Sequence, residues 1–567
     1  MRCKARSTAM PIGIASIRNA AARPYRADST DPISVIQWTR RTPGRPHRPH
    51  PPHRPHPPHN AVMHRTPQPQ RITTTNGPWP LHSATASRSA ERVALGNAAM
   101  GTLMARAGLA VARLARATAP HATLVQVWAG PGNNGGDGLV AARELHRAGL
   151  GVQVILLADV ARLPADAAAA LKAADEAGVQ IASTPLTSQA PGLVIDALLG
   201  LGTSRAPSAA LARAIAHING GIAATSAPVL AVDIPSGLHP DTGAVLGQAA
   251  VMAQTTLSLL TLKPGCFTHQ GRDHAGVVWL DTLGVVADGH TAWLNGPPPH
   301  PARPHTGHKG RYGDVAVVGG ATGMVGAAWL AAGAALAAGA GRVYCSLLGD
   351  TAAGPPPGRP ELMTRAQWWL SPPTALAATT VVCGCGGGSG SNLQQALPPL
   401  LSHAGRLVLD ADALNALAAD GTLQLLLRQR GSRGLPTLLT PHPLEAARLL
   451  SCLIADVQRD RIAAAQTLSA QFGVTVLLKG SGTVVASTTD LPHINCTGNA
   501  ALATAGTGDV LAGWAGGLWA QQPEAAASAV ATAAAWQHGR AADTFAADFP
   551  GRALRAAELI EALACGR

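Results

Sequence analysis

The sequence predicts two α/β domains behind a disordered leader, the first of them with a doubly wound parallel sheet. The chain has 567 residues, 47% of them hydrophobic, which is more than one hydrophobic core usually holds. Short apolar segments typical of buried strands alternate with helical segments through both halves of the chain. A proline-rich stretch between the halves is typical of a linker, so we expect one domain on either side of it.

Residues 1–80 show no pattern that could bury a core. They hold 13 of the 44 Lys and Arg residues but only two of the 31 acidic ones. Arg45 to His59 consists of five triplets of Pro and His with Arg, a composition that favours extended polyproline II structure. Three interpretations stay open: a mistranslated upstream extension with Met63 as a later start, a disordered basic tail, or a metal-binding His tract or transit peptide.

Charge and cysteine content restrict the function of the remaining chain. Beyond residue 80 it has 31 basic and 29 acidic residues, so this near-neutral part gives no reason to expect nucleic-acid binding. Residues 324–341 are uncharged, but their Ala and Gly content favours a buried helix over a membrane span. The eight cysteines are scattered, which favours reduced thiols. We expect a cytoplasmic protein without nucleic-acid or membrane partners, and a homo-oligomer.

The first domain is expected over residues 81–294. Helical periodicity runs through residues 85–118, with Leu95, Leu103 and Leu109 among its apolar positions. Strand and helix patterns then alternate, which indicates a doubly wound parallel sheet. The expected strands are 123–128, 152–157, 192–196, 229–233 and 276–281, and the expected helices are 137–148, 164–177 and 208–218.

A linker is predicted at residues 295–306, where proline is frequent. The second domain is expected over residues 307–567, where a second α/β pattern follows. Its expected strands lie near 314–318, 342–347, 379–383, 406–410, 436–440, 474–478 and 483–486.

Polar residues follow three strands of the first domain. Gly130 to Gly138 form a glycine-rich turn that opens a helix, where backbone amides can approach an anionic ligand. A tight turn alone would not require the Asn-Asn pair and the Asp of this motif. Asp196 and Asp233 end two further strands, and the carboxyl ends of parallel strands share one crevice. The oxygens of Asn134, Asp196 and Ser236 suit a monovalent cation, with Asp233 beside them as a candidate acid or base.

These motifs resemble the NAD(P)H-hydrate epimerase domain of bifunctional nicotinamide-nucleotide repair enzymes. The matching segments are GPGNNGGDG, DALLGLGTSRAP, VDIPSGLHPDTG and TLKPGCFTHQGRDHAG, in this order, over about residues 81–290. The resemblance implies a Rossmann-like fold, a catalytic and substrate-binding Asp233, and potassium held by Asn134, Asp196 and Ser236. The other implied substrate-binding residues are Asn133, Asn134, Gly135, Gly136, Asp137, Gly200, Leu201, Gly202, Thr203, Ser204, Arg205 and Ala206.

The second half carries a Gly-Thr-Gly-Asp motif, Gly506 to Asp509, in front of an apolar helix. Amides at a helix start can hold phosphate, and the Asp509 carboxylate can remove a hydroxyl proton, as phosphoryl transfer requires. An isolated motif of this kind could equally be a helix N-cap. The context favours a functional site, because Lys479 to Thr483 offers a second glycine turn and His442 follows another strand.

The second set of motifs resembles the ribokinase-like superfamily and, within it, the ADP-dependent NAD(P)H-hydrate dehydratases. It comprises HKGRYG, VVGGATGMVGAAWLAAGAAL, RPELM, LDADALNAL, TPHP, LKGSGTVV and GTGDVLAG, over about residues 305–567. The resemblance implies that Asp509 is the catalytic base. The implied substrate contacts are Ala327, Gly386, His442 and Asp509, and the implied ADP contacts are Lys479, Gly480, Ser481, Gly482, Thr483 and Gly508.

The chain departs from this family's usual pattern in three places. Leu444 replaces a Gly after TPHP, and Ala500 to Leu502 replace a Pro-Gly-Met sequence. The turn Gly384-Cys385-Gly386-Gly387-Gly388 replaces a GPGLG-like turn. None of these departures removes a candidate catalytic group.

Together the two resemblances imply a metabolite-repair enzyme. NAD(P)H can gain water across a nicotinamide ring double bond, giving a hydrate with two epimers. The first domain would interconvert these epimers with potassium, and the second would dehydrate the S-hydrate at the expense of ADP, with magnesium. The alternative is a small-molecule kinase, acting on a vitamin precursor, that carries a non-catalytic epimerase-like binding domain.

Overall fold

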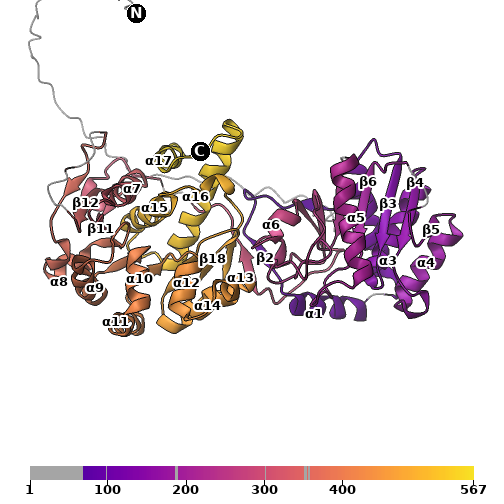
Figure 1. Ribbon diagram of the computed structural model, residues 1–567, viewed down its shortest axis with the longest axis horizontal. Coiled ribbons are helices and arrows are strands. Elements are labelled where there is room, and N and C mark those ends of the chain that lie inside the picture. Colours follow the sequence, from indigo (N-terminus) through magenta and orange to yellow (C-terminus); the bar gives the residue numbers. More distant parts are fainter. Residues whose placement is uncertain are drawn as a thin grey trace, which may run out of the picture. The chain divides into compact units, whose positions relative to one another are not determined.

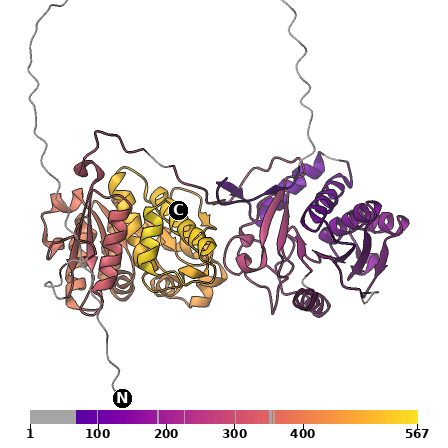
Figure 2. The ribbon, with the colours of Figure 1, turned by 90° about the horizontal axis from the view of Figure 1, so that it is seen from above.

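The computed structural model describes residues 68–566 except 98, 186–188, 226, 300–301, 350–353 and 355–357. Most of the predicted leader therefore lies outside the described residues. The described part holds two sheets, each with helices on both faces (Figures 1 and 2). This architecture confirms the predicted α/β fold of both halves, and the doubly wound sheet predicted for the first half.

The first sheet has eight strands in the order β1-β9-β8-β7-β6-β3-β4-β5, and only β1 is antiparallel to its neighbour. The chain runs outward from β3 in one direction and from β6 in the other. These neighbouring strands therefore form a topological switch point, where ligand crevices open. The strands are β1 (Gln70–Arg71), β3 (Leu124–Ala129), β4 (Gly151–Leu156), β5 (Gln180–Ala182), β6 (Leu193–Ala197), β7 (Val229–Val232), β8 (Thr255–Leu259) and β9 (Val277–Asp281).

Helices cover both faces of this sheet because successive strand residues point to opposite sides. Val127 of β3 packs in the apolar cluster that includes α2, α3 and α4, whereas its neighbour Trp128 packs in the cluster that includes α5. The helices of this half are α1 (Ala84–Gly96), α2 (Thr102–Thr118), α3 (Asn133–Arg147), α4 (Ala165–Glu176), α5 (Ala209–Thr225) and α6 (Gly271–His274).

The second sheet has eleven strands in the order β13-β12-β11-β14-β15-β16-β17-β18-β19-β10-β2. The strands from β13 to β17 are parallel, and the chain again runs outward in two directions, from β11 and from β14. The strands are β2 (Trp79–Leu81), β10 (Ala292–Leu294), β11 (Asp314–Gly319), β12 (Arg342–Leu347), β13 (Met363–Thr364), β14 (Thr380–Cys383), β15 (Arg406–Leu409), β16 (Thr437–Leu439), β17 (Thr475–Leu478), β18 (Thr483–Ala486) and β19 (His493–Asn495).

Two apolar clusters lie on either side of this sheet. Val317 belongs to the cluster formed with α7, α15, α16 and α17, and Val318 belongs to the cluster formed with α8 to α14. Figures 1 and 2 show α7 and α15 packed side by side. The helices are α7 (Val325–Ala337), α8 (Pro373–Ala378), α9 (Ser391–His403), α10 (Asp412–Ala419), α11 (Gly421–Ser432), α12 (Pro443–Leu450), α13 (Ile454–Arg459), α14 (Arg461–Phe472), α15 (Thr507–Gln521), α16 (Ala527–Asp548) and α17 (Ala556–Ala564).

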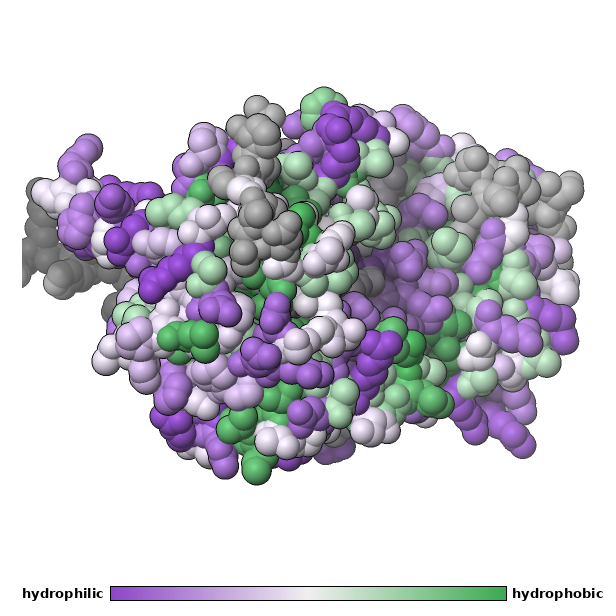
Figure 3. Space-filling view, turned by 60° about the vertical axis from the view of Figure 1, so that its left-hand side comes forward, coloured by the Kyte–Doolittle hydropathy of each residue, from purple (hydrophilic) through white to green (hydrophobic). Residues whose placement is uncertain are grey.

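The uncharged segment 324–341 contains the buried helix that the sequence predicted, α7. On the face shown in Figure 3, hydrophobic residues are interspersed with hydrophilic ones. None of the helices in the described part of the chain is long and apolar enough to cross a membrane, and the uncharged segment around α7 forms part of a core. The seven cysteines that the structure describes are all free thiols.

Several elements differ from the predicted ones. The helical pattern of residues 85–118 forms two helices, with Gly101 between them at a φ of 77°. The helix predicted from residue 137 begins at Asn133, so the Asn-Asn-Gly-Gly sequence lies inside α3. β8 was not predicted because buried Thr256 and Ser258 interrupt its apolar pattern. The strands β5, β13 and β19 were not predicted because each has only two or three residues.

The predicted leader also ends earlier than residue 80. β1 and the first two residues of β2 lie within residues 1–80, and β2 pairs with β10, which comes from the end of the predicted first domain. Leu81 is fully buried, and its carbonyl oxygen accepts a hydrogen bond of 2.8 Å from the N–H of Thr291. Both strands at this edge of the second sheet therefore come from sequence that precedes the predicted linker.

We predict that removing residues 1–67 leaves the thermal midpoint within about 1 °C of the full chain, whereas removing residues 1–82 lowers it by several degrees. The longer deletion removes β2 and the buried Leu81 side chain, whose burial stabilises the fold by about 2–3 kcal/mol. Differential scanning calorimetry of the two truncated chains tests this. Equal midpoints would show that β2 contributes nothing to the second sheet.

Candidate active sites

The first candidate site lies at the switch point between β3 and β6. The N–H of Gly130, directly after β3, donates to the carbonyl oxygen of Ala197 at 3.0 Å. A Cβ atom on Gly130 would lie 1.8 Å from the carbonyl oxygen of Leu198, so only glycine fits at this position. The turns after these two strands therefore touch, as the sequence predicted from the shared crevice.

Packing accounts for two glycines of the Asn-Asn-Gly-Gly-Asp motif. A Cβ on Gly135 would lie 2.1 Å from the oxygen of Gly130, and a Cβ on Gly136 would lie 2.6 Å from Cε of Met104. These contacts let α3 begin close to the strand and explain why low-propensity glycines occur in its first turns. Asn133 is exposed at the helix start, so it is the accessible end of the motif.

The three residues of the predicted cation site are linked through the turn after β6. The hydroxyl of Ser236 donates to Oδ1 of Asp196 at 2.6 Å, and its backbone N–H donates to Oδ2 at 2.8 Å. The N–H of Leu199 donates to the Ser236 hydroxyl at 2.8 Å. Asn134 lies against the next residue of that turn, because a Cβ on Gly200 would be 2.9 Å from its Oδ1. Burial raises the pKa of Asp196 to about 6.

Asp233 forms an ion pair with Lys263, a buried lysine to which the sequence analysis assigned no role. The ammonium of Lys263 also donates to the carbonyl oxygen of Leu259 at 2.7 Å. Asp233 has a φ of 67°, which is strained for a residue with a side chain. Its Oδ2 accepts a hydrogen bond of 3.2 Å from the N–H of Leu201, so it holds the start of the predicted substrate turn.

The predicted substrate turn has a buried and an exposed part. Thr203 is buried, and its hydroxyl donates to the carbonyl oxygen of Gly200 at 2.8 Å. Ser204, Arg205 and Ala206 are exposed. The structure thus brings the first residues of the turn to Asn134 and Asp233, whereas the last three face solvent.

Two more carboxyl groups belong to the surroundings of Asp233. Burial, followed by the negative charges of Asp233 and Glu91, raises the pKa of Asp137 well above its ordinary value. Burial also raises the pKa of Glu91, which lies on α1. No sequence pattern marked Glu91, because it lies within a helix rather than at a strand end. A sequence feature could have marked Lys263 as functional, because it is a single cation within the apolar and glycine-rich segment that follows β8.

The second candidate site lies at the switch point between β11 and β14. A Cβ on Gly319, the last residue of β11, would lie 2.3 Å from the carbonyl oxygen of Cys385, and the N–H of Gly320 donates to that oxygen at 3.0 Å. Gly386 has a φ of 58°, and a Cβ there would lie 2.8 Å from Cβ of Ala327. Two predicted substrate contacts, Ala327 and Gly386, are therefore neighbours.

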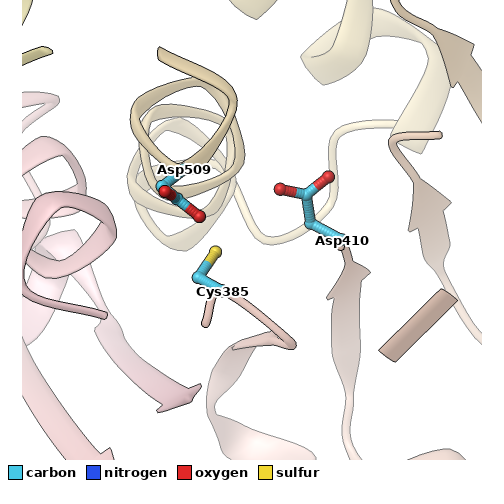
Figure 4. Close-up of side chains that lie close together, drawn as sticks. All are labelled: Cys385, Asp410 and Asp509. Carbon is cyan, nitrogen blue, oxygen red and sulfur yellow. The ribbon is translucent and has the colours of Figure 1, made fainter. Parts of the chain in front are cut away.

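Asp509 stands at the start of α15 beside a buried ion pair. The ammonium of Lys479 lies 2.7 Å from Oδ1 of Asp410, which also accepts a hydrogen bond of 2.8 Å from the Thr440 hydroxyl. Figure 4 shows the Asp410 and Asp509 carboxylates on either side of the Cys385 sulfur. Burial, and next the charge of Asp410, raises the pKa of Asp509 to about 6.

His442 caps α12 and joins the same group of charges. Its Nδ1 accepts hydrogen bonds from the N–H groups of Leu444 and Glu445 at 3.1 and 3.3 Å. Burial and the nearby Lys479 charge lower the pKa of His442, so the imidazole is neutral at pH 7. Glu445, which the sequence analysis missed, lies 3.9 Å from the Lys479 ammonium, and burial raises its pKa to about 7.

The predicted ADP contacts fall into two groups. Lys479 reaches α15, because a Cβ on Gly508 would lie 3.4 Å from its ammonium. The turn of residues 480–483 follows Lys479 and begins with Gly480, which has a φ of 134°. The Thr483 hydroxyl closes this turn by donating to the carbonyl oxygen of Gly480 at 3.1 Å. Ser481 is exposed, and its hydroxyl donates to the carbonyl oxygen of His269 at 2.9 Å. Gly508 and Asp509 thus lie with Lys479, whereas Ser481 lies farther along the turn.

Known proteins resemble both halves of the chain. Residues 100–265 match the YjeF-related protein N-terminus family, and residues 315–564 match the NAD(P)H-hydrate dehydratase family. A bifunctional NAD(P)H-hydrate repair enzyme of Escherichia coli is 38% identical over 479 residues, covering 81% of this chain and 88% of that protein.

Two further proteins resemble the second half. An ADP-dependent (S)-NAD(P)H-hydrate dehydratase of Neisseria meningitidis is 45% identical over 245 residues, covering 43% of this chain and 80% of its own length. A crystal structure of the ADP/ATP-dependent NAD(P)H-hydrate dehydratase of Bacillus subtilis, with ATP and Mg²⁺, has 26% identity and a TM-score of 0.38, covering 47% of this chain and 93% of that one.

We predict that Lys479→Met destabilises the protein by about 3–5 kcal/mol, because it leaves the Asp410 carboxylate buried without its cation. Adding Asp410→Asn should recover most of the loss, since the amide carries no charge. Urea unfolding at pH 7.5 measures both effects. Lys172→Met is the control: its exposed ammonium lies 3.8 Å from Glu176, so its loss should cost under about 1 kcal/mol. A Lys479→Met protein as stable as the control would contradict the prediction.

Proposed function

The chain belongs to the family of bifunctional NAD(P)H-hydrate repair enzymes, and from this premise we propose which residues carry out its two reactions. The first site interconverts the R- and S-hydrates of NADH and NADPH. The second site converts the S-hydrate to NAD(P)H and consumes ADP. The observation that best supports the second activity is the position of Asp509 in the first turn of α15, beside Gly508 and Lys479.

The dehydratase reaction needs a better leaving group than hydroxide. Asp509 removes the proton of the substrate hydroxyl. The hydroxyl oxygen of the substrate then attacks the terminal phosphorus of ADP, and AMP is released. Phosphate then leaves with the electrons of the C–O bond, and loss of a proton from the neighbouring carbon restores the ring double bond. The amides in the first turn of α15 and the Lys479 ammonium face the charge that develops on the transferred phosphoryl group.

The substrate binds against the turns at the switch point. Ala327 and Gly386 lie side by side, since a Cβ on Gly386 would be 2.8 Å from Cβ of Ala327, and we propose that this pair contacts the hydrate. The neutral imidazole of His442 supplies a polar edge without adding a positive charge. Gly480, Ser481, Gly482 and Thr483 hold the nucleotide at the end of the site reached by Lys479.

Magnesium would bind mainly through the ADP phosphates. The carboxylates of Asp410 and Asp509 are not proposed as its ligands, because Oδ1 of Asp410 is committed to Lys479 and Thr440 and Asp509 serves as the base. The Cys385 sulfur nearby is too soft to be a ligand for this ion. When bound, magnesium would neutralise phosphate charge, while Asp509 remains the group that accepts the proton.

In the epimerase site, Asp233 exchanges a proton with the hydrate. The Lys263 ammonium holds the Asp233 carboxylate in place, and the carboxylate fixes the turn that begins at Leu201. Asp137 has a raised pKa and can supply a proton to the same substrate. Asn133, at the exposed start of α3, would contact the dinucleotide together with Gly202 to Ala206.

Asn134, Asp196 and Ser236 would hold potassium. They offer three oxygen donors, and the buried Nδ2 of Asn134 has no hydrogen-bond partner among the described residues. The amide nitrogen of Asn134 is therefore unpaired among the described residues, and its Oδ1 lies beside the turn that carries the Asp196 and Ser236 contacts. Bound potassium would neutralise the buried Asp196 carboxylate and attract the phosphates of the dinucleotide.

We predict that Asp509→Asn lowers kcat for S-hydrate dehydration by at least about 10²-fold, because the amide cannot accept the hydroxyl proton. ADP should still bind, and epimerisation should continue. The pKa of Asp509 is raised to about 6, so the folded protein favours the protonated carboxyl group. Above pH 6 the ionised carboxylate reduces the free energy of unfolding. The neutral amide should therefore not lower stability at pH 7.5. Steady-state rates on purified S-hydrate, with calorimetric titration of ADP, measure these effects. Turnover near wild type would rule out Asp509 as the base.

We predict that Asp233→Asn stops conversion of the R-hydrate to the S-hydrate while the S-hydrate is still dehydrated. The amide cannot exchange the proton, and it leaves Lys263 without its counter-ion. The assay follows each epimer by chromatography, with spontaneous epimerisation subtracted. A normal rate of epimerisation in this variant would show that another group, such as Asp137, carries the proton.

A further inference from the structure

We propose that Cys385 is a positioning residue of the dehydratase site, whose S–H group donates to the Asp509 carboxylate and holds it ready to accept the substrate proton. This inference rests on the proposed role of Asp509 as the base. It assigns a function to the residue that stands where the family usually has proline. The supporting observations are the placement of the thiol, the lack of other donors to Asp509 among the described residues, and the different surroundings of the neighbouring thiol of Cys383.

The backbone fixes Cys385 at the switch point. It lies between two glycines in the left-handed region, Gly384 with a φ of 116° and Gly386 with a φ of 58°. Its carbonyl oxygen accepts from Gly320 at 3.0 Å, and Gly386 accepts from Ala321 at 2.7 Å. These bonds tie the turn to the end of β11. Cys385 is fully buried, so its side chain has little freedom to move away from the site.

The thiol lies close to both carboxylates of the site. The Cys385 sulfur and one oxygen each of Asp410 and Asp509 all lie within 4.8 Å of one another. Figure 4 shows the sulfur directed toward the space between the two carboxylates, with Asp509 coming from α15 and Asp410 from the end of β15. Burial and the charges of both aspartates raise the pKa of the Cys385 thiol well above its ordinary value. The group therefore stays S–H, which can donate a hydrogen bond.

Asp509 lacks the donors that its neighbour has. Asp410 accepts hydrogen bonds from Lys479 and Thr440, whereas no nitrogen or oxygen atom of the described residues donates to the Asp509 side chain. The thiol is therefore the donor available to the base. A hydrogen bond to the ionised form lowers the pKa of Asp509 and opposes the effects of burial and of the Asp410 charge.

A neighbouring thiol provides a matched comparison. Cys383 is also fully buried and lies two residues earlier, but its side chain packs in the apolar cluster on the other face of the sheet. Burial alone raises the pKa of its thiol, so no charged group is involved. Replacing Cys383 should therefore reproduce the packing loss of a buried thiol without affecting Asp509.

The test compares pH profiles of kcat for S-hydrate dehydration in the full chain. Cys385→Ala should move the acid limb upward by roughly 0.5–1 pH unit, the effect of losing one hydrogen bond to the carboxylate. The KM for S-hydrate should stay within about twofold, and epimerisation should be unchanged. Cys385→Ser retains a donor, so its acid limb should lie at or below that of the wild-type enzyme. Cys383→Ala should leave the limb in place.

The outcomes separate the two proposals. The positioning role is overturned if the acid limb does not move in Cys385→Ala, or if it moves equally in Cys383→Ala. In that case Asp509→Asn still abolishes dehydration, and the proposed function stands. If Cys385→Ala does not fold, the serine variant decides, because an upward shift in a stable Cys385→Ser protein also overturns the role. Normal dehydration by Asp509→Asn would instead overturn the proposed function, and the role of Cys385 with it.

Discussion

Both sites depend on the same steric constraint, the direct contact of two turns where the strand order of a parallel sheet reverses. At the first switch point Gly130 touches Leu198, and at the second Gly319 touches Cys385. A Cβ atom would lie 1.8 Å from the Leu198 oxygen at Gly130 and 2.3 Å from the Cys385 oxygen at Gly319, so either substitution would push the turns apart. Such a change would separate Asn134 from Gly200 in one half and would displace Cys385 from the carboxylates in the other. Each site therefore requires glycine at one position, Gly130 in the first half and Gly319 in the second.

Each site also buries one lysine against one aspartate, but the pairing serves different ends. In the first half Lys263 contacts Asp233 itself, so the cation holds the proposed acid-base group and the turn bound to it. In the second half Lys479 contacts Asp410, the neighbour of the proposed base. Asp509 is left without a cation of its own, and its pKa rises to about 6. A carboxylate with such a pKa is ionised at neutral pH and accepts a proton more readily than an ordinary aspartate.

The sequence predicted the elements that have strong periodicity and the groups that stand at strand ends. Asp196, Asp233 and Asp509 could be predicted because polar residues after apolar strands, or before an apolar helix, are conspicuous. β8 could not be predicted, because the buried hydroxyls of Thr256 and Ser258 break the apolar pattern of the strand. Glu91 and Glu445 could not be predicted, since they lie within helices and reach the sites only through packing. The pairing of β2 with β10 joins distant segments, and no local pattern encodes such a contact.

The charge balance of the second site bears on how a kinase-like arrangement can perform a dehydration. Asp410, Asp412 and Asp509 bring several negative charges to the proposed site of the ADP phosphates, and Lys479 neutralises only part of them. Incoming phosphates would raise the pKa of Asp509 further and protonate it unless other groups offset their charge. The amides at the start of α15 and the magnesium bound by the phosphates can supply that compensation, and the Cys385 thiol acts on the carboxylate directly. The base thus stays ionised only while nucleotide charge is neutralised locally, which would tie proton removal to correct binding of the phosphoryl donor.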